Sequence, residues 1–142
     1  MIKKKDLKFG FKNEKDAHPI LEKTFGILKN TKDYLGKNFE FDKFNDKYYI
    51  ELKSRRINHN KYNSLYFGKN KFDKGNQLLE DGPNLRIFYI WKCYDGYYYW
   101  EHDSSPYRIK IQGRCDRGKD EYNDCIDIEN QYIHSLEELS IN

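Results

Sequence analysis

The segment from residue 49 to residue 54 places charged side chains where they could do chemistry. Glu51 and Lys53 are separated by the apolar Leu52. In an extended strand, side chains two positions apart lie on the same face, so a carboxylate and an ammonium group would be held side by side. Asp42 would reach the same spot if its segment pairs antiparallel with that strand. We therefore predict that two carboxylates and a lysine converge there.

Two carboxylates at one place are typical of a site for a hard divalent cation. Mg²⁺ takes oxygen ligands and is usually held by one or two carboxylates together with water and substrate phosphate. Asp42 and Glu51 meet that requirement. Lys53 beside them could orient or deprotonate a water molecule, or offset the charge that develops on a phosphorane-like transition state. The alternative interpretation is an exposed cross-strand ladder of salt bridges, worth about 0.2–1 kcal/mol for each pair.

These residues need a strand hairpin to position them, and the pattern of residues 39–54 predicts one. Polar and apolar residues alternate over residues 39–42 and again over residues 50–53. Between the two runs lies a polar turn at Asn45 and Asp46. Period-two alternation on both sides of a turn is typical of two adjacent antiparallel strands.

A helix is predicted before the hairpin, from residue 13 to about residue 28. Apolar residues fall there at steps of four, four and three, which places them on one helical face. Pro19 leaves two interpretations open: it lies in the first turn of a helix that begins near Asp16, or it kinks a helix that Asn13 caps. The residues of the apolar face are Ala17, Leu21, Phe25 and Leu28.

The remaining elements complete an α/β (α+β) fold, with a mixed sheet and flanking helices. Nothing in the sequence marks a linker or repeat, so residues 1–142 are predicted to form a single domain. The predicted elements are a weak helix at residues 69–80, strands at 85–92 and 97–102 joined by Asp95-Gly96, a strand at 107–111 and a short helix at 134–139.

Composition excludes some classes of protein. Hydrophobic residues make up 37% and aromatic residues 17%, which argues against a disordered chain. The formal net charge of +3 is too small to indicate a nucleic-acid partner by itself. Residues 53–74, however, are strongly basic, and residues 115–142 are acidic. No apolar run is long enough to cross a bilayer and no secretory signal is present, so we expect no membrane partner and an intracellular, cytoplasmic location.

The candidate residues resemble those of the PD-(D/E)xK nuclease superfamily, the fold of restriction endonucleases and Holliday-junction resolvases. The resemblance covers roughly residues 10–112 and is carried by residues 39–42 and 49–55. Residues 68–71 and 113–119 are also similar to small nuclease-like proteins of large DNA viruses, which would place the protein in a host cell. The proline of the motif is replaced by Phe41.

The resemblance implies a metal-dependent endonuclease that hydrolyses phosphodiester bonds of DNA, with branched or viral DNA as the expected substrate. It implies Mg²⁺ or Mn²⁺ as the cofactor. By this resemblance Asp42 and Glu51 are catalytic metal ligands, Lys53 is the catalytic lysine, and the backbone carbonyl of Leu52 is a further ligand.

Many members of the superfamily add a glutamate from the first helix, and Glu14 matches it because it lies on the face of Leu21. Glu22 is the alternative, on a different face of the helix. A homodimer is expected by analogy with enzymes that cut two strands. The alternative function is a catalytically inactive nucleic-acid-binding or structural module of the same fold.

The basic stretch after the candidate site predicts a track for DNA phosphates, with Tyr62 and Tyr66 available for sugar or base contacts. The alternative is a solvated face in a lysine-rich chain. The aromatic run at residues 97–100 is interpreted as core rather than as a stacking platform, and His59 and His102 as surface histidines. The predicted DNA contacts are Arg55, Arg56, Lys61, Lys69, Lys71 and, in a glycine-flanked loop, Arg114, Arg117 and Lys119.

Overall fold

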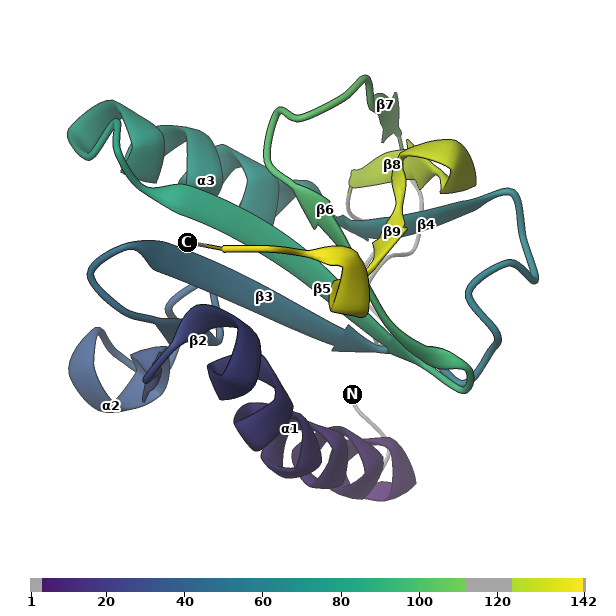
Figure 1. Cartoon of the computed structure of the whole chain (residues 1–142), viewed down its shortest axis with the longest axis horizontal. Coiled ribbons are helices and arrows are strands. Elements are labelled where there is room, and N and C mark those ends of the chain that lie inside the picture. The colour runs from purple at the N-terminus through teal and green to yellow at the C-terminus, as the bar shows by residue number, and fades with distance from the viewer. Residues whose placement is uncertain (1–3, 112–123, 142) are drawn as a thin grey trace.

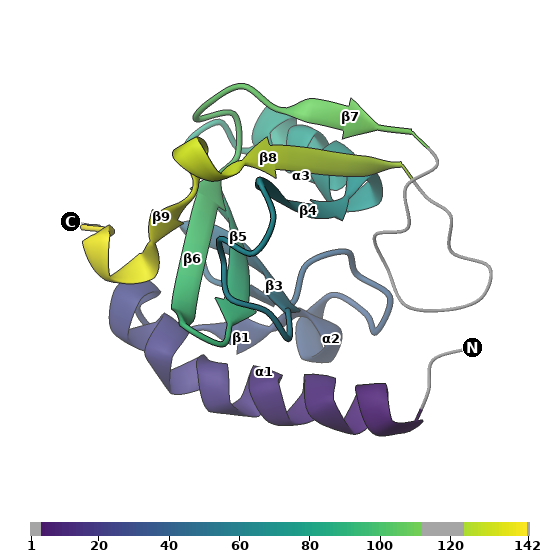
Figure 2. The same ribbon diagram turned by 90° about the vertical axis from the view of Figure 1, so that its right-hand side faces the viewer.

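The chain folds into layers around a central six-stranded sheet. The computed structural model describes the backbone of residues 4–111 and 124–141, and side chains within these ranges from residue 14 onward. Helix α1 (Lys4–Phe25) packs on one face of the sheet. Helix α3 (Lys69–Asp81) and a three-stranded sheet pack on the other face (Figures 1 and 2). This mixed α/β architecture confirms the predicted fold class.

The strands of both sheets come from distant parts of the sequence. In the central sheet β3 and β5 are parallel, and the other neighbouring strands are antiparallel. Its order is β1 (Lys29–Asn30), β2 (Lys43–Phe44), β3 (Tyr48–Ser54), β5 (Arg86–Cys93), β6 (Gly96–Glu101) and β9 (His134–Ser135). The order of the second sheet is β4 (Ser64–Gly68), β8 (Cys125–Glu129) and β7 (Arg108–Lys110). Short helical turns are α2 (Thr31–Tyr34), η1 (Asn130–Tyr132) and η2 (Leu136–Glu138).

Helix α1 is longer than its apolar stripe. All four residues of the predicted stripe are buried, but Leu28 lies beyond the helix, which was predicted to continue to about residue 28. The helix begins at Lys4, well before both predicted starts, which are therefore wrong. Pro19 lies well inside the helix. The residues before position 13 include several lysines, which favour a helix by propensity. The helix ends at Phe25, where Gly26 adopts a φ of +86° and turns the chain.

The first hairpin is confirmed, but its first strand is short. β2 contains Lys43 and Phe44 alone, so the whole alternating run at residues 39–42 that predicted the first strand lies outside it. The reason is a competing partner, because the backbone carbonyls of Phe41 and Asp42 accept hydrogen bonds from Thr31. The predicted turn is stabilised by the Asn45 side chain, whose Oδ1 accepts the backbone N–H groups of residues 47 and 48.

The second hairpin joins β5 to β6 at the predicted turn, where Gly96 has a φ of +138°. The predicted helix at 69–80 is α3, and the predicted strand at 107–111 is β7. The predicted C-terminal helix is instead the short strand β9 followed by the 3₁₀ turn η2. The aromatic run of β6 buries Trp100 fully and its three tyrosines in part, which supports the interpretation as core.

Alternation along β3 gives its two faces different neighbours. Ile50 lies opposite Phe88 of β5, and both pack in the cluster under α1. Glu51 lies opposite Tyr89, which packs in the cluster under α3 and β4. The charged residues of β3 therefore face the layer formed by α3 and the second sheet.

Candidate functional site

Asp42 and Glu51 come together at the end of the first hairpin. The Asp42 N–H donates to the Ile50 carbonyl over 3.0 Å, and the Asp42 Oδ2 accepts the Leu52 N–H over 2.8 Å. Asp42 is thereby held on both sides of Glu51, by its backbone at Ile50 and by its side chain at Leu52. The predicted convergence of the two carboxylates is confirmed, whereas their role as metal ligands stays a prediction.

Glu51 is buried deeply for a carboxylate, with only 7% of the residue exposed. Burial, the charge of Asp42 and a hydrogen bond with the Asp42 side chain raise the pKa of Glu51 well above its ordinary value. The alternative of an exposed salt-bridge ladder is therefore wrong for Glu51. A buried carboxyl beside a second carboxylate forms a site that a cation would stabilise.

Lys71 is the cation that contacts Glu51. Its Nζ lies 3.1 Å from Glu51 Oε2, and it reaches the strand from the first half of α3. The charge and hydrogen bond of Lys71 oppose the rise in the Glu51 pKa. The sequence assigned Lys71 to a DNA phosphate track, but the structure places it in an ion pair with a candidate metal ligand.

Lys53 lies on the same face of β3 as Glu51, beside a group of cations around Tyr66. The Lys53 Nζ is 5.1 Å from the centre of the Tyr66 ring, and the Arg55 guanidinium is 4.5 Å from it. Lys110 of β7 approaches the same ring at 5.9 Å. The Arg55 Nη1 is buried and has no hydrogen-bond partner among the described residues. The positively charged side chains of Arg55 and Lys110 therefore lie close to Lys53 around one aromatic ring.

Glu14 approaches Asp42 from helix α1. It is partly buried, and burial followed by the charge of Asp42 raises its pKa, while Lys43 opposes the rise. Lys43, which the sequence analysis did not single out, is only 2% exposed and donates to Asn30 Oδ1 over 2.8 Å. Burial lowers the pKa of Lys43, against the effect of Glu14. Glu14, Asn30 and Lys43 share the lining of an open cavity of about 410 Å³.

Glu22, the alternative to Glu14, is engaged elsewhere. Its Oε2 accepts the Leu28 N–H over 3.0 Å, and its Oε1 lies 3.3 Å from His18 Nε2. These contacts hold the Glu22 carboxylate at the end of α1. Glu14, by contrast, lies close enough to Asp42 for the charge of Asp42 to raise the Glu14 pKa. Glu14 also lines the cavity together with Lys43.

The described side chains can be compared with the ligands that a divalent cation requires. Within the described ranges, no group of three or more His, Cys, Asp or Glu side chains is arranged to hold a metal ion. Mg²⁺ commonly needs only one or two carboxylates, because water and substrate phosphate supply the remaining oxygen ligands. The hydrogen-bonded pair of Asp42 and Glu51 fits that requirement.

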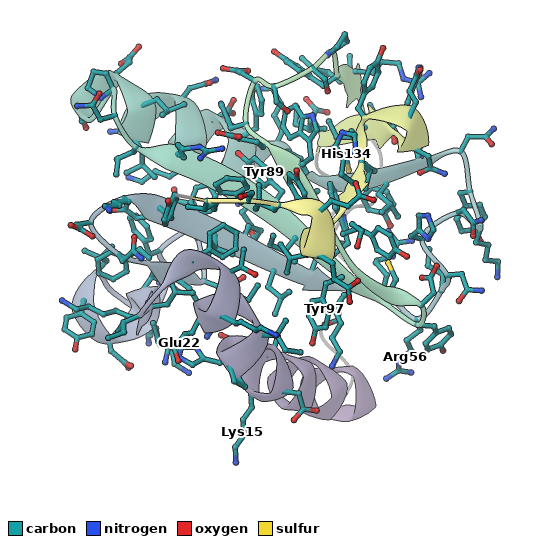
Figure 3. The ribbon with its side chains drawn as sticks, in the orientation of Figure 1. Lys15, Glu22, Arg56, Tyr89, Tyr97 and His134 are labelled. Atoms are coloured by element: carbon teal, nitrogen blue, oxygen red, sulfur yellow. The ribbon has the colours of Figure 1, made fainter. Side chains whose placement is uncertain are left out.

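The other predicted DNA contacts are dispersed. Lys61 lies over the Tyr62 ring at 5.7 Å, and Lys69 pairs with Asp73 of its own helix at 2.9 Å. Arg56 is exposed and projects at the lower right of Figure 3, from the loop that follows β3. Three further predicted contacts, Arg114, Arg117 and Lys119, lie outside the described residues.

A buried polar chain beside the site was missed by the sequence analysis. The side chains of Tyr89 and His102 are 2.7 Å apart at Oη and Nδ1, and His102 Nε2 lies 2.7 Å from Asn76 Oδ1 (Tyr89 is labelled in Figure 3). Because an amide oxygen only accepts, Nε2 carries the proton and Nδ1 accepts from Tyr89. His102 is 7% exposed, so the prediction that it lies at the surface is wrong. The side chain of His59 is partly exposed and pairs with Asp95.

One comparison with known proteins returned a match. Residues 29–138 match the model of a family described as "Phage putative PDDEXK endonuclease". No curated protein and no solved structure matches the sequence. Over the described ranges, no helix combines the length and the apolar character needed to cross a bilayer.

Proposed function

Because the chain belongs to the phage PDDEXK endonuclease family, we propose that it hydrolyses phosphodiester bonds of DNA at the Asp42–Glu51 site. Nucleases of the PD-(D/E)xK type generally use a divalent metal ion. The observation that carries the proposal is the hydrogen-bonded pair of acids, one of them buried, on a rigid hairpin. Buried as it is, Glu51 is costly to ionise without a cation, and a cation is what the proposed chemistry requires.

Asp42 and Glu51 are the proposed metal ligands, for Mg²⁺ or Mn²⁺. The Leu52 carbonyl and Glu14 are proposed as additional ligands. A bound divalent cation would neutralise charge on the phosphodiester and lower the pKa of a water molecule. The clamp between Asp42 Oδ2 and the Leu52 N–H supports this assignment, since it holds one carboxylate in place before any substrate arrives.

Lys53 is the proposed catalytic lysine. It lies on the Glu51 face of β3, two positions further along the strand, and its ammonium is close to the Tyr66 ring. From this place its charge can orient the attacking water or stabilise the negative charge that develops on the phosphate oxygens.

The proposed path of the DNA backbone runs from Lys53 along the cations around Tyr66. Arg55 and Lys110 belong to different elements and meet at one aromatic ring, which offers phosphates two cations and a sugar or base a stacking surface. Arg56, Lys61 and Lys69 would extend this surface with additional positive charge.

The test is cleavage of labelled plasmid, linear duplex, single strand and four-way junction, in Mg²⁺, in Mn²⁺ and in EDTA. Glu51→Gln and Lys53→Ala are compared with Glu80→Gln, an exposed acid on α3. We expect metal-dependent cleavage by the wild type and by Glu80→Gln, and loss of cleavage in the other two while they remain folded. Metal-independent DNA binding without cleavage would instead support the inactive binding module.

A further inference from the structure

The contact between Lys71 and Glu51 has a consequence for metal binding. We propose that Lys71 acts as an internal counter-ion that occupies the carboxylate of Glu51, leaves it when a divalent cation binds, and is then available to a substrate phosphate. This inference rests on the proposed function, because it takes Glu51 as a metal ligand. Lys71 lies outside the nuclease motif and was predicted only to contact DNA phosphate. The inference gives it a second role, that of positioning the Glu51 carboxylate until the metal ion binds.

The charges at the site favour such an exchange. Asp42 and Glu51 share a hydrogen bond in a buried place, and the Lys71 ammonium contacts Glu51 at 3.1 Å. One ammonium offsets one of the two negative charges when both acids are ionised, whereas a divalent cation offsets both. An ammonium and a divalent cation that use the same carboxylate oxygen compete for it, so each lowers the affinity of the other.

The Lys71 side chain has room to move, because 24% of it is exposed, compared with 10% for that of Glu51. Its backbone, however, is held in place. Phe72 is buried in the core under the sheet, and a Cβ at Gly75 would lie 2.9 Å from both His102 and Tyr89. The exchange is therefore a rotation of the Lys71 side chain about a fixed helix.

The other lysines of α3, a helix that lies wholly in the described part of the chain, have different partners. Lys69 pairs with Asp73 at 2.9 Å on the exposed side of the same helix. Lys74 lies 5.0 Å from the centre of the Phe39 ring. Lys69 is therefore a matched control, a lysine two residues away that is also ion-paired but with an acid outside the site.

The experiment measures Mn²⁺ binding to the full chain without DNA, by calorimetry and by electron paramagnetic resonance. The variants are Lys71→Met, Lys69→Met and Glu51→Gln, each checked for folding by thermal unfolding. Methionine keeps the apolar stem of lysine without its charge. We expect Lys71→Met to bind Mn²⁺ about tenfold more tightly or better, the size of effect that one neighbouring charge has on an ionisation equilibrium. Lys69→Met should bind like the wild type.

Release of Lys71 is followed directly by the resonances of ¹³C-dimethylated lysines, assigned by the loss of a peak in Lys71→Met. Saturating Mg²⁺ should move the Lys71 resonance toward the position of exposed lysines. In saturating Mn²⁺, Lys71→Met should also cleave DNA more slowly than the wild type.

The outcomes separate this inference from the proposed function. If the wild type binds Mn²⁺, Glu51→Gln does not, and folded Lys71→Met binds no more tightly, then Lys71 is no competitor and the inference is overturned while the metal site stands. If neither the wild type nor Lys71→Met binds Mn²⁺, the metal site and the inference both fail. Binding by Lys71→Met alone would support the inference in its strongest form.

Discussion

The two faces of the central sheet differ in what they bury. The face under α1 is closed mainly by apolar side chains such as Leu21, Ile50 and Phe88, each fully buried. Lys43, which lies opposite Ile50 and lines the cavity with Glu14, is also buried. The face under α3 buries aromatic residues together with the ionisable side chains of Glu51 and His102. Both faces are built on the same strands, and successive side chains along each strand point to opposite faces.

This difference separates stability from chemistry within one strand. Ile50 anchors β3 to the α1 layer through burial of apolar surface, which favours folding. Glu51 on the other face holds charge in a place where desolvation opposes it. The apolar face therefore supports a polar face that would be costly by itself, and substitutions on the two faces should have different effects.

The sharpest way to disturb the α3 face alone is Asp42→Asn. The amide oxygen of Asn can still accept the Leu52 N–H, so the fold should be retained, while the loss of a charged metal ligand should reduce DNA cleavage by about 1000-fold. Cleavage rates at saturating Mg²⁺ and thermal unfolding measure the two effects. Asp42→Ala, which removes the acceptor as well, should also lower the unfolding temperature. Equal cleavage by Asp42→Asn and the wild type would contradict the assignment.

On the α1 face, Leu21→Ala should do the opposite. Leu21 is fully buried, so we expect the free energy of unfolding to fall by about 2–5 kcal/mol. Cleavage per folded molecule, measured well below the melting temperature, should be unchanged. Ile20→Ala is the control, because its side chain is largely outside the core at 40% exposure and should change stability by about 0.5 kcal/mol or less. A selective loss of cleavage in Leu21→Ala would show that the two faces are not independent.

The buried His102 makes the α3 face sensitive to acid. Burial lowers its pKa from the ordinary 6.5, so the folded protein binds fewer protons than the unfolded chain as the pH falls below about 6.5. Stability should therefore fall with pH in that range, by at most about 1.4 kcal/mol per pH unit. Urea unfolding between pH 5 and 8 measures this slope.

The control for acid sensitivity is a pair of histidine variants. His102→Gln should have a shallower slope than the wild type, because the group that titrates is gone. His134→Gln, which replaces an exposed histidine, is the matched control. An unchanged slope in His102→Gln would assign the acid sensitivity to other groups.

The smallest effect is expected at the cations around Tyr66. Arg55→Gln should weaken DNA binding by about three- to fivefold and reduce the slope of log affinity against log salt by about one, as loss of one phosphate contact does. Fluorescence anisotropy across a salt series measures both quantities. Lys15→Gln is the charge-matched control, since Lys15 projects away from α1 in Figure 3. Identical salt slopes for the two variants would remove Arg55 from the DNA path.

Much of the local structure could be predicted because its signals are local. The turn at Asn45, the turn at Gly96 and the apolar stripe of α1 each depend on residues close together in the sequence. Strand β4 was missed although Leu65 and Phe67 alternate with polar residues, because the basic residues around it favoured a surface segment. The length of β2 was overestimated because Thr31, ten and eleven positions away, takes the backbone carbonyls of Phe41 and Asp42 as its acceptors.

The sequence by itself determined that Asp42 and Glu51 meet, because a hairpin brings together residues on either side of one turn. Only the tertiary structure decided how deeply Glu51 is buried and that Lys71 is its partner. It also decided that His102 is a core residue. The physical reason is that α3, β4 and β6 reach this place from separate segments. Burial and charge pairing at the site depend on how these elements pack, which periodicity within one strand does not encode.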